Sequence, residues 1–502
     1  MSDRPDDGAG AVPHMTPERF RAEGVRAVEW VARYMETVGD QRVAPETTPG
    51  EVYAALPDAA PERGEDDAMG GMLADLERLV VPNSMHWQHP SFFGYFPCGS
   101  SGPAVIAELL SAGLGVQGML WSTGPACTEV ETRMLDWMGE AIGLPPAFLS
   151  PSRTGGGSIQ GTASESAVVA LVAGRRRLAE RVEEREGRDA VRAIRPVVYA
   201  SQQAHSSIAK AAVVTGVALD AADDQRIRLV PVDEACRMRP DELERMLRED
   251  VAAGLHPVML CVTLGTTGST AIDPLDACAR VWREHAPDGW LHIDAAHAGA
   301  MLVCPEHRSM LEGVEHADSL CFNPHKWLLV NFDCDLFWTR DRAALTGALS
   351  ITPEYLRNDA TDAGAVIDYR DWQVPLGRRF RALKLWAVLR HYGLGGLCAF
   401  VREHVAWAAW LEQRIREDDR FELLAERTMN LVCFADRRGD EATRGLMERL
   451  NASGRVFLSH TVLPGGQGDR YVIRVSIGAT PTRFEHVEAL WALIDAETGR
   501  VD

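Results

Sequence analysis

The sequence predicts an α/β protein whose central sheet is mostly parallel and covered by helices on both faces. Between about residues 100 and 380, short apolar runs rich in β-branched side chains alternate with longer segments of helical periodicity. Continuous apolar runs are typical of strands buried on both faces, and helices usually connect parallel strands. The expected strands are 196–200, 228–232, 257–263, 290–294 and 319–322, and the expected helices include 160–185, 206–215, 240–252 and 275–285.

The N-terminal segment, residues 1–100, is predicted to form helices outside this sheet. A leader rich in Asp, Gly and Pro precedes Thr16, which we expect to be a helix N-cap, with Pro17 in the first turn. The apolar residues of 17–38 follow helical periodicity, and a second helix is expected at 67–80. Such helices cannot bury their apolar faces alone, so we expect this segment to pack on the partner subunit of a homodimer.

The last hundred residues have a different pattern. Helices are expected near 395–416, 439–451 and 483–497, and strands near 430–434, 455–462 and 470–477. This mixture indicates a compact α+β domain. We therefore divide the chain into the N-terminal segment, a large domain at 101–383 and a small C-terminal domain at 384–502.

Composition limits the classes of function. A hydrophobic content of 46% with 25% charged residues is typical of a globular protein, and the net charge of −20 argues against nucleic-acid and membrane-surface partners. No run approaches the roughly 20 apolar residues that cross a bilayer, and the acidic start lacks a signal-peptide core. The ten cysteines include no C-x-x-C pair, which favours reduced thiols over disulfides or a metal site. We therefore expect a cytoplasmic enzyme without a metal.

Two residues near the ends of expected strands suggest a cofactor. Asp294 ends the strand at 290–294, and Lys326 lies in Asn323–Trp327, just after the strand at 319–322. A lysine that forms an imine and an upstream aspartate that pairs with a pyridine nitrogen are the two groups on which pyridoxal 5'-phosphate most depends. Either residue alone is more simply a surface charge, a cap or a turn. Their order and spacing together favour a pyridoxal phosphate site.

A glycine-rich segment, Gly155–Glu165, runs into an expected helix. Glycines let the backbone approach a ligand closely, and a helix N-terminus offers unpaired N–H groups to an anion. The segment lacks the lysine of a Walker A motif and the context of a dinucleotide-binding motif. Alone it is more simply a flexible turn. With Asp294 and Lys326 it favours a phosphate cradle, in which Ala163 and Ser164 provide N–H and hydroxyl groups.

Further polar residues follow the expected strands. His205 could stack on a flat cofactor ring and bind a substrate carboxylate, or it could simply cap a helix. Thr267 suits either a cofactor face or a polar turn. Asn323 and His325 flank Lys326 and could bind the phosphate or orient the imine.

These motifs together resemble the pyridoxal-phosphate-dependent group II amino acid decarboxylases, specifically the aromatic L-amino acid decarboxylase branch. The resemblance extends from about Pro17 to the final helix. It is carried by His86–Trp87, His89–Pro90, Gly94–Pro97, Ser122–Glu131, Gln203–Ser207, Asp294–Ala296, Asn323–Cys334 and Pro375–Arg381. It implies the aspartate-aminotransferase-like fold, called fold type I, and a homodimer with shared active sites.

The resemblance also implies roles for individual residues. Lys326 would hold the cofactor as an imine that the substrate amine displaces, and Asp294 would keep the pyridine nitrogen protonated, so that the ring accepts electrons as CO₂ leaves. His205 would stack on the ring and help to place the carboxylate. A Cα–carboxylate bond held perpendicular to the ring would select decarboxylation. The residues expected to bind the cofactor are Ala163, Ser164, His205, Thr267, Asp294, Ala296, Asn323, His325 and Lys326.

The product is expected to depend on Tyr355, which lies in a polar stretch with the composition of a mobile lid. In the family that the chain resembles, a tyrosine here reprotonates the α-carbon and gives an amine, whereas relatives with phenylalanine tend to form an aldehyde with oxygen. Tyr355 and His205 together therefore favour a true decarboxylase. Without the resemblance, a tyrosine in an exposed loop would need no functional explanation.

The substrate pocket is expected to have a wall suited to an aromatic side chain. Its residues are Trp87, Tyr95, Phe96, Pro97, Cys98, Met119 and Gly377. The sequence departs from the animal enzymes of the family at Cys98 (threonine there), Met119 (an aromatic there) and His297 (commonly tyrosine). These changes leave the reaction type intact and bear on substrate preference. Gly377 leaves room for a bulky ring such as an indole.

We therefore predict decarboxylation of an aromatic L-amino acid (DOPA, tyrosine, tryptophan, phenylalanine or 5-hydroxytryptophan) to the arylalkylamine and CO₂. The first alternative is an aromatic aldehyde synthase of the same family, which would release peroxide and ammonia. A decarboxylase of acidic or diamino substrates is disfavoured by the aromatic wall. A catalytically silent binding protein is disfavoured because Lys326, Asp294, His205 and Tyr355 are all present.

Overall fold

The large sheet has the predicted architecture. The computed structural model describes residues 14–351, 366–464 and 468–499. Seven strands form one sheet in the order β1-β7-β6-β5-β4-β2-β3, in which β2 to β6 are parallel and β7 is antiparallel to both of its neighbours. The strands are β1 (Gly156–Gln160), β2 (Pro196–Ser201), β3 (Ile227–Val230), β4 (His256–Thr263), β5 (Trp290–Asp294), β6 (Ser319–Phe322) and β7 (Asp335–Thr339). The mostly parallel α/β fold class is thus confirmed.

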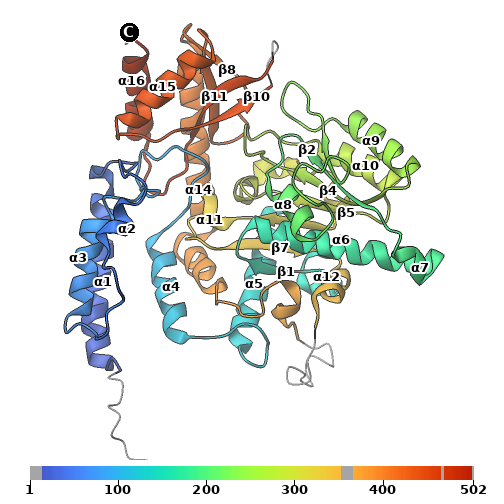
Figure 1. Cartoon of the computed structure of the whole chain (residues 1–502), viewed down its shortest axis with the longest axis horizontal. Helices are drawn as coiled ribbons and strands as arrows, with labels where there is room; N and C mark the ends of the chain where they lie inside the picture. Colours follow the sequence, from blue (N-terminus) through green and yellow to red (C-terminus); the bar gives the residue numbers. More distant parts are fainter. Residues whose placement is uncertain (1–13, 352–365, 465–467, 500–502) are drawn as a thin grey trace, which may run out of the picture.

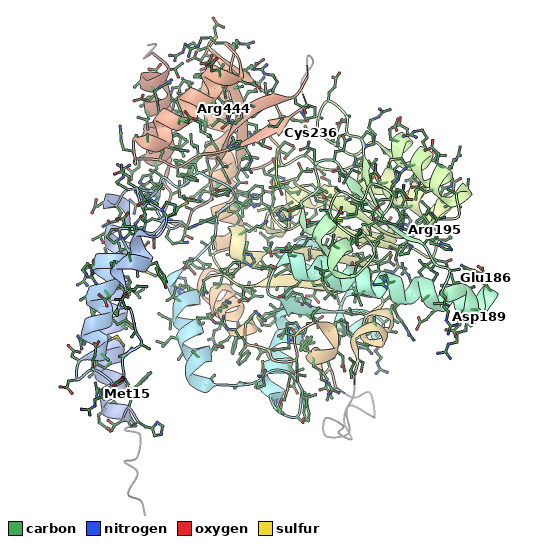
Figure 2. All side chains as sticks on the ribbon, viewed as in Figure 1. Met15, Glu186, Asp189, Arg195, Cys236 and Arg444 are labelled. Atoms are coloured by element: carbon green, nitrogen blue, oxygen red, sulfur yellow. The ribbon has the colours of Figure 1, made fainter. Side chains whose placement is uncertain are left out.

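Helices cover both faces of this sheet (Figure 1). On one face α6 (Ala163–Glu186) packs against α8 (Ser207–Val214), and on the other α9 (Pro240–Ala252) packs against α10 (Leu275–His285), as right-handed crossovers between parallel strands require. Because both faces are covered, every residue of β5 is buried. Glu186 and Asp189, at the end of α6 and in α7 (Arg188–Val191), are exposed and mark the far edge of the helical layer (Figure 2).

Four elements of the large domain differ from the sequence expectation. The glycine-rich segment forms strand β1, and Gly157 lies so close to β7 that a Cβ atom would meet the Phe337 carbonyl oxygen at 2.8 Å. Glycine is thus needed there for strand packing rather than for a loop. Strand β7 was not predicted, and neither were α4 (Gly102–Leu114) and α5 (Pro125–Ile142). Beside these lie the short α11 (Pro324–Trp327) and α12 (Arg342–Leu349).

The N-terminal helices lie beside the main body rather than within it (Figure 1). They are α1 (Pro17–Thr37), α2 (Glu51–Ala55) and α3 (Ala68–Asp75), which continues as the π-helical turn η2 (Leu76–Val80). Thr16 caps α1 as expected, since its hydroxyl accepts a hydrogen bond from the Arg19 backbone N–H at 3.2 Å. In this single chain α1 buries no residue, and its apolar Phe20 and Val28 are more than half exposed.

A second, antiparallel sheet forms near the C-terminus. Its strands follow the order β10-β11-β9-β8, with two helices packed beside them. The elements are β8 (Phe421–Leu423), β9 (Leu431–Asp436), α15 (Asp440–Ala452), β10 (Ser459–Leu463), β11 (Arg470–Ser476) and α16 (Phe484–Thr498). The connecting helix α14 (Ala382–Arg416) is interrupted at Gly393, where φ is 62°. The domain boundary proposed at 383/384 lies near the start of this helix.

Two further findings concern membranes and metal ions. Across the part of the chain that the structure describes, no helix combines the length and apolar character needed to span a bilayer. The same residues contain no group of three or more potential metal ligands.

Candidate active site

The ends of the central parallel strands converge on one cavity of about 220 Å³. Asp294 ends β5 and stands in register between Thr263 of β4 and Cys321 of β6. The turn after β6 is joined to the turn after β5, because the Asn323 N–H donates to the Ala296 carbonyl at 3.1 Å. Lys326 follows within α11. The fold therefore brings the predicted aspartate and lysine to the carboxyl edge of the sheet, where such sheets bind ligands.

All nine residues predicted to contact the cofactor line this cavity. They are Ala163, Ser164, His205, Thr267, Asp294, Ala296, Asn323, His325 and Lys326. Several others that line it were not predicted as site residues, namely Thr162, Ser207, Thr263, Gly265, His297 and Phe332. Thr263 and Gly265 could have been found, because they end β4 beside a strand that already carried a predicted residue.

Lys326 combines a buried position with a perturbed amine. Burial lowers the pKa of its amine, and the neighbouring carboxylates of Asp294 and Asp335 act in the opposite direction. Its Nζ lies 5.3 Å from the centre of the Phe96 ring. A lowered pKa increases the share of neutral amine, which is the form that attacks an aldehyde.

Asp294 is a buried carboxylate that lies near the Lys326 amine but forms no direct ion pair among the described residues. Its Oδ1 accepts a hydrogen bond from the Ala296 backbone N–H at 2.9 Å, and its side chain is largely removed from water. A buried carboxylate is stable when it is paired with a cation. A protonated pyridine nitrogen within the cavity would supply that partner.

Two of the histidines that line the cavity are His205 and His325. His205 Nδ1 accepts a hydrogen bond from the Ser207 backbone N–H at 3.1 Å, so Nε2 carries the proton of the neutral ring. Burial lowers the pKa of His205, and so does the charge of Lys326. Burial also lowers the pKa of His325, to about 4. Both imidazoles are therefore neutral near pH 7, and His205 offers an N–H donor rather than a charge.

The remaining lining residues form an anion cradle. Ala163 and Ser164 are the first residues of α6, whose N-terminal N–H groups and dipole attract a phosphate. Glu165 caps the preceding turn by accepting the Gly161 N–H at 2.7 Å. Asn323 contributes a buried side-chain amide, whose NH2 group can donate to an anion. The lysine, the unpaired carboxylate and the cradle fit the aldehyde, the pyridine nitrogen and the phosphate of pyridoxal phosphate.

The predicted substrate wall is only partly present in this cavity. Phe96 lines it, whereas Trp87 and Tyr95 stack at 5.6 Å in a neighbouring cluster with Phe92 and Phe457. Tyr95 has a left-handed φ of 50° there. Neither ring therefore borders the cavity of the single chain, although both residues are close to Phe96 in the sequence.

The other four predicted substrate residues also lie outside the cavity lining. Pro97 packs against Gly478, and the Cys98 carbonyl accepts a hydrogen bond from Gln88 at 2.5 Å. Met119 and Gly377 lie together in a different region. Their sequence neighbours are joined there, because the Gly118 N–H donates to the Arg378 carbonyl at 3.2 Å. Tyr355, the predicted acid, lies outside the described residues.

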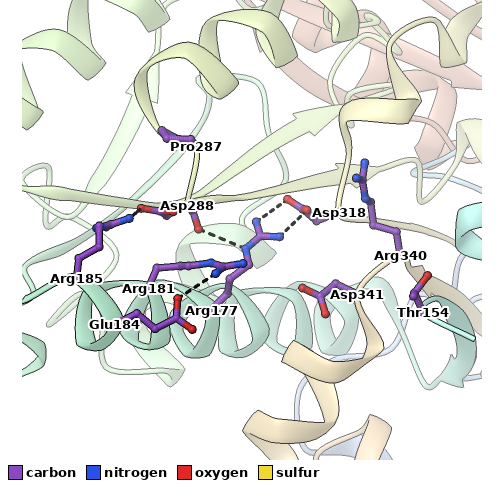
Figure 3. Close-up of a pocket in the computed structure, with 10 residues that line it drawn as sticks. All are labelled: Thr154, Arg177, Arg181, Glu184, Arg185, Pro287, Asp288, Asp318, Arg340 and Asp341. Carbon is purple, nitrogen blue, oxygen red and sulfur yellow. Dashed lines mark hydrogen bonds and ion pairs between the residues drawn. The ribbon is translucent and has the colours of Figure 1, made fainter. Parts of the chain in front are cut away.

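A larger cavity of about 710 Å³ lies elsewhere on the molecule and contains none of the predicted residues (Figure 3). Three of its four arginines have carboxylate partners: Arg177 pairs with Asp318 at 2.6 Å, Arg181 with Glu184 at 3.0 Å, and Arg185 with Asp288 at 2.6 Å. We interpret this cavity as a charge-paired surface that ties α6 to the sheet.

Comparison with known families agrees with the chemistry of the Lys326 cavity. Residues 49–437 match the family described as the pyridoxal-dependent decarboxylase conserved domain. The chain is 41% identical over 480 residues to the aromatic-L-amino-acid decarboxylase of Bos taurus, which covers 95% of each chain. It is 40% identical over 502 residues to the phenylacetaldehyde synthase of Arabidopsis thaliana, with 98% of each chain covered.

Among solved structures, the chain resembles that of Oryza sativa TDC with PLP and tryptamine. The TM-score is 0.91 with 38% sequence identity, over 97% of this chain and 99% of that one. The match confirms the predicted fold family and extends over both sheets. The chain therefore belongs to the pyridoxal-dependent decarboxylases, carboxy-lyases that use pyridoxal 5'-phosphate.

Proposed function

We propose that the protein decarboxylates an aromatic L-amino acid to the corresponding arylalkylamine and CO₂. The observation that carries this proposal is the single cavity in which Lys326 and Asp294 face an aromatic wall formed by Phe96. The similarity to aromatic-L-amino-acid decarboxylase and to tryptophan decarboxylase 2 of Oryza sativa supports an aromatic substrate.

Each of the main residues of the cavity has a separate role. Pyridoxal phosphate, when bound, supplies a ring that accepts the electron pair left as CO₂ departs. Asp294 would pair with the pyridine nitrogen of the cofactor through the negative charge of its carboxylate. Lys326 would hold the cofactor through its amine. Ala163, Ser164 and Asn323 would hold the phosphate.

His205 positions the substrate. Its Nε2–H is free to donate because Nδ1 is already occupied by the Ser207 N–H. A donor at this place can hold the substrate carboxylate out of the cofactor plane, the orientation that selects cleavage of that bond. The neutral state of His205 leaves the departing carboxylate without an ion pair that would stabilise it before reaction.

We further propose a homodimer whose subunits share their active sites. Helix α4 exposes Ile106, Leu109 and Leu110, each at least half accessible in the single chain, and α1 exposes further apolar residues. Such a surface favours burial against a second copy. Met119 and Gly377, predicted to contact substrate, border no part of the chain's own cavity. A partner subunit that supplies them would complete the aromatic pocket.

The main alternative is an aromatic aldehyde synthase, because phenylacetaldehyde synthases are among the similar proteins. Tyr355 in the sequence favours the decarboxylase. Purified protein with cofactor should be incubated separately with tyrosine, DOPA, phenylalanine, tryptophan and 5-hydroxytryptophan, while amine, aldehyde, CO₂ and peroxide are measured. Amine and CO₂ in equal amounts support the proposal, peroxide with aldehyde supports the alternative, and no product from any substrate refutes both.

We also propose a cytoplasmic location. All ten cysteines are free thiols in the structure, and nine of them are buried. Free thiols fit a reducing compartment. Fractionation of the native host would test this proposal.

A further inference from the structure

His297 lies beside Phe96 in the lining of the cavity. It follows the turn after β5 and is almost completely buried, with 1% of its surface exposed. Its imidazole stacks on the Phe96 ring, with centroids 3.9 Å apart and planes inclined by 15°. At this separation the two rings are in van der Waals contact, so the size of one determines the position of the other.

The small domain holds the His297 ring in one orientation. Asn430, which precedes β9, donates from Nδ2 to the Ile477 carbonyl at 2.8 Å, so its Oδ1 faces the imidazole. His297 Nε2 lies 2.7 Å from this oxygen and must carry the proton that it accepts. Burial lowers the pKa of His297 to about 3, so the ring against Phe96 is neutral.

The stack cannot move away from the cavity. Trp327 lies on His297 with centroids 5.1 Å apart and planes inclined by 14°. This indole is fully buried, and its Nε1–H donates to His404 Nδ1 at 2.9 Å. Phe96, His297 and Trp327 thus form one stack that is anchored at its inner end. Its outer end, the Phe96 ring, borders the cavity.

We propose that His297 is a specificity-determining residue, whose ring size, together with that of Phe96, sets the room in the cavity and therefore how large an aromatic side chain the substrate can have. The inference rests on the proposed decarboxylation of aromatic amino acids. Added volume at position 297 meets the anchored Trp327 and the side chain of Asn430, so it is directed toward Phe96 and into the cavity. The five-membered ring of histidine leaves this part of the cavity open, which favours bicyclic indole side chains.

The test enlarges the ring at this position. His297→Tyr is expected to lower kcat/KM for tryptophan about tenfold or more relative to kcat/KM for tyrosine. His297→Ala is expected to change the same ratio in the opposite direction. The double variant His297→Tyr with Phe96→Leu should recover the wild-type ratio, because a smaller residue at position 96 returns the lost space. General damage to the fold would not be repaired selectively by a second core substitution.

Binding provides a readout that is independent of turnover. Indole-3-propionate and 3-phenylpropionate lack the amine that reacts with the cofactor, and calorimetry with the holoenzyme gives the ratio of their dissociation constants. We expect His297→Tyr to weaken indole-3-propionate selectively. An unchanged ratio in folded His297→Tyr, or a ratio that Phe96→Leu does not restore, overturns the proposal. If His297→Tyr does not fold, the sign of the change in His297→Ala decides.

Failure of the proposed function and failure of the His297 proposal give different results. A wild-type protein that releases no amine or aldehyde from any aromatic amino acid refutes the proposed function. The ratio of the two dissociation constants can still be measured in that case, and it tests the role of His297 alone.

Discussion

At the scale of single residues, the buried amine of Lys326 should make the cofactor-free protein depend on pH. Its pKa is lowered in the folded state, so between its folded pKa and its unfolded pKa of about 10.4 the unfolded chain binds more protons than the native chain. The free energy of unfolding contributed by this group therefore rises with pH and levels off above its unfolded pKa of about 10.4. Removing the amine should stabilise the cofactor-free protein at neutral pH.

Lys326→Met tests this expectation by urea denaturation at several pH values. Its gain over the wild type should be largest near pH 7 and should shrink as the pH approaches about 10. Lys210→Met is the matched control, because Lys210 lies exposed on α8 and has no comparable burial. Equal changes in both variants at every pH would contradict the assignment of a buried, destabilising amine.

The second prediction at this scale concerns Tyr355. If it is the acid that returns a proton to the α-carbon, Tyr355→Phe removes that proton source while leaving Lys326 and Asp294 in place. Amine formation should fall by about a hundredfold or more, the range typical of a lost general acid, and aldehyde with peroxide should become the main product. Product analysis by chromatography, with a peroxide assay in parallel, checks both quantities. Unchanged amine output would remove Tyr355 from this role.

The residue scale also shows how far sequence reasoning reaches. Asp294, Asn323 and Lys326 could be grouped because each follows a predicted parallel strand, and the ends of such strands meet at one edge of the sheet. No comparable sequence pattern indicates which residues form the substrate wall. Phe96 reaches the cavity from outside the sheet, and the role of His297 depends on contacts with Phe96 and Trp327 that no local pattern encodes.

At the scale of elements, backbone packing decided where prediction failed. Gly155–Glu165 has the composition of a turn, yet Gly156 and Gly157 belong to strand β1, where a side chain at Gly157 would collide with β7. Helices such as α9 matched the expected bounds because their hydrophobic periodicity is set by one buried face. Helix α4 has little such contrast, since apolar residues lie on both its buried and exposed sides.

The exposed side of α4 supports the third prediction. Leu110 is 56% accessible in the single chain, and a charge there should be harmless in a monomer but costly in an interface. Leu110→Glu should therefore shift the protein from dimer to monomer, as measured by light scattering after size exclusion. Val251→Glu is the control, because Val251 on α9 is similarly exposed at 47%. A Leu110→Glu protein that keeps the wild-type mass would exclude α4 from the interface.

At the scale of the whole molecule, the cavity of one chain contains the cofactor residues but not the complete predicted substrate pocket. The large domain brings together all nine residues predicted to bind the cofactor, whereas Met119 and Gly377 belong to a separate region of the same chain. A two-fold dimer resolves this separation if each subunit completes the cavity of the other. The sequence could suggest the dimer through its apolar helices, but no periodicity states which residues cross between subunits.

Mixed dimers test this arrangement directly. Lys326→Ala removes the reactive amine, and Gly377→Trp places a large ring in the region proposed to serve the partner's cavity. The nearest atoms to a Cβ at position 377 belong to the flexible end of Gln117, at 3.3 Å or more, and Gly377 is exposed, so this substitution should not disturb the fold of its own subunit. Each variant alone should be inactive. Subunits unfolded and refolded together in equal amounts should form half hybrids, in which one site combines an intact Lys326 with an intact Gly377. Activity should then return to about one quarter of the wild-type value. If each active site were built from a single chain, the refolded mixture would stay as inactive as its components.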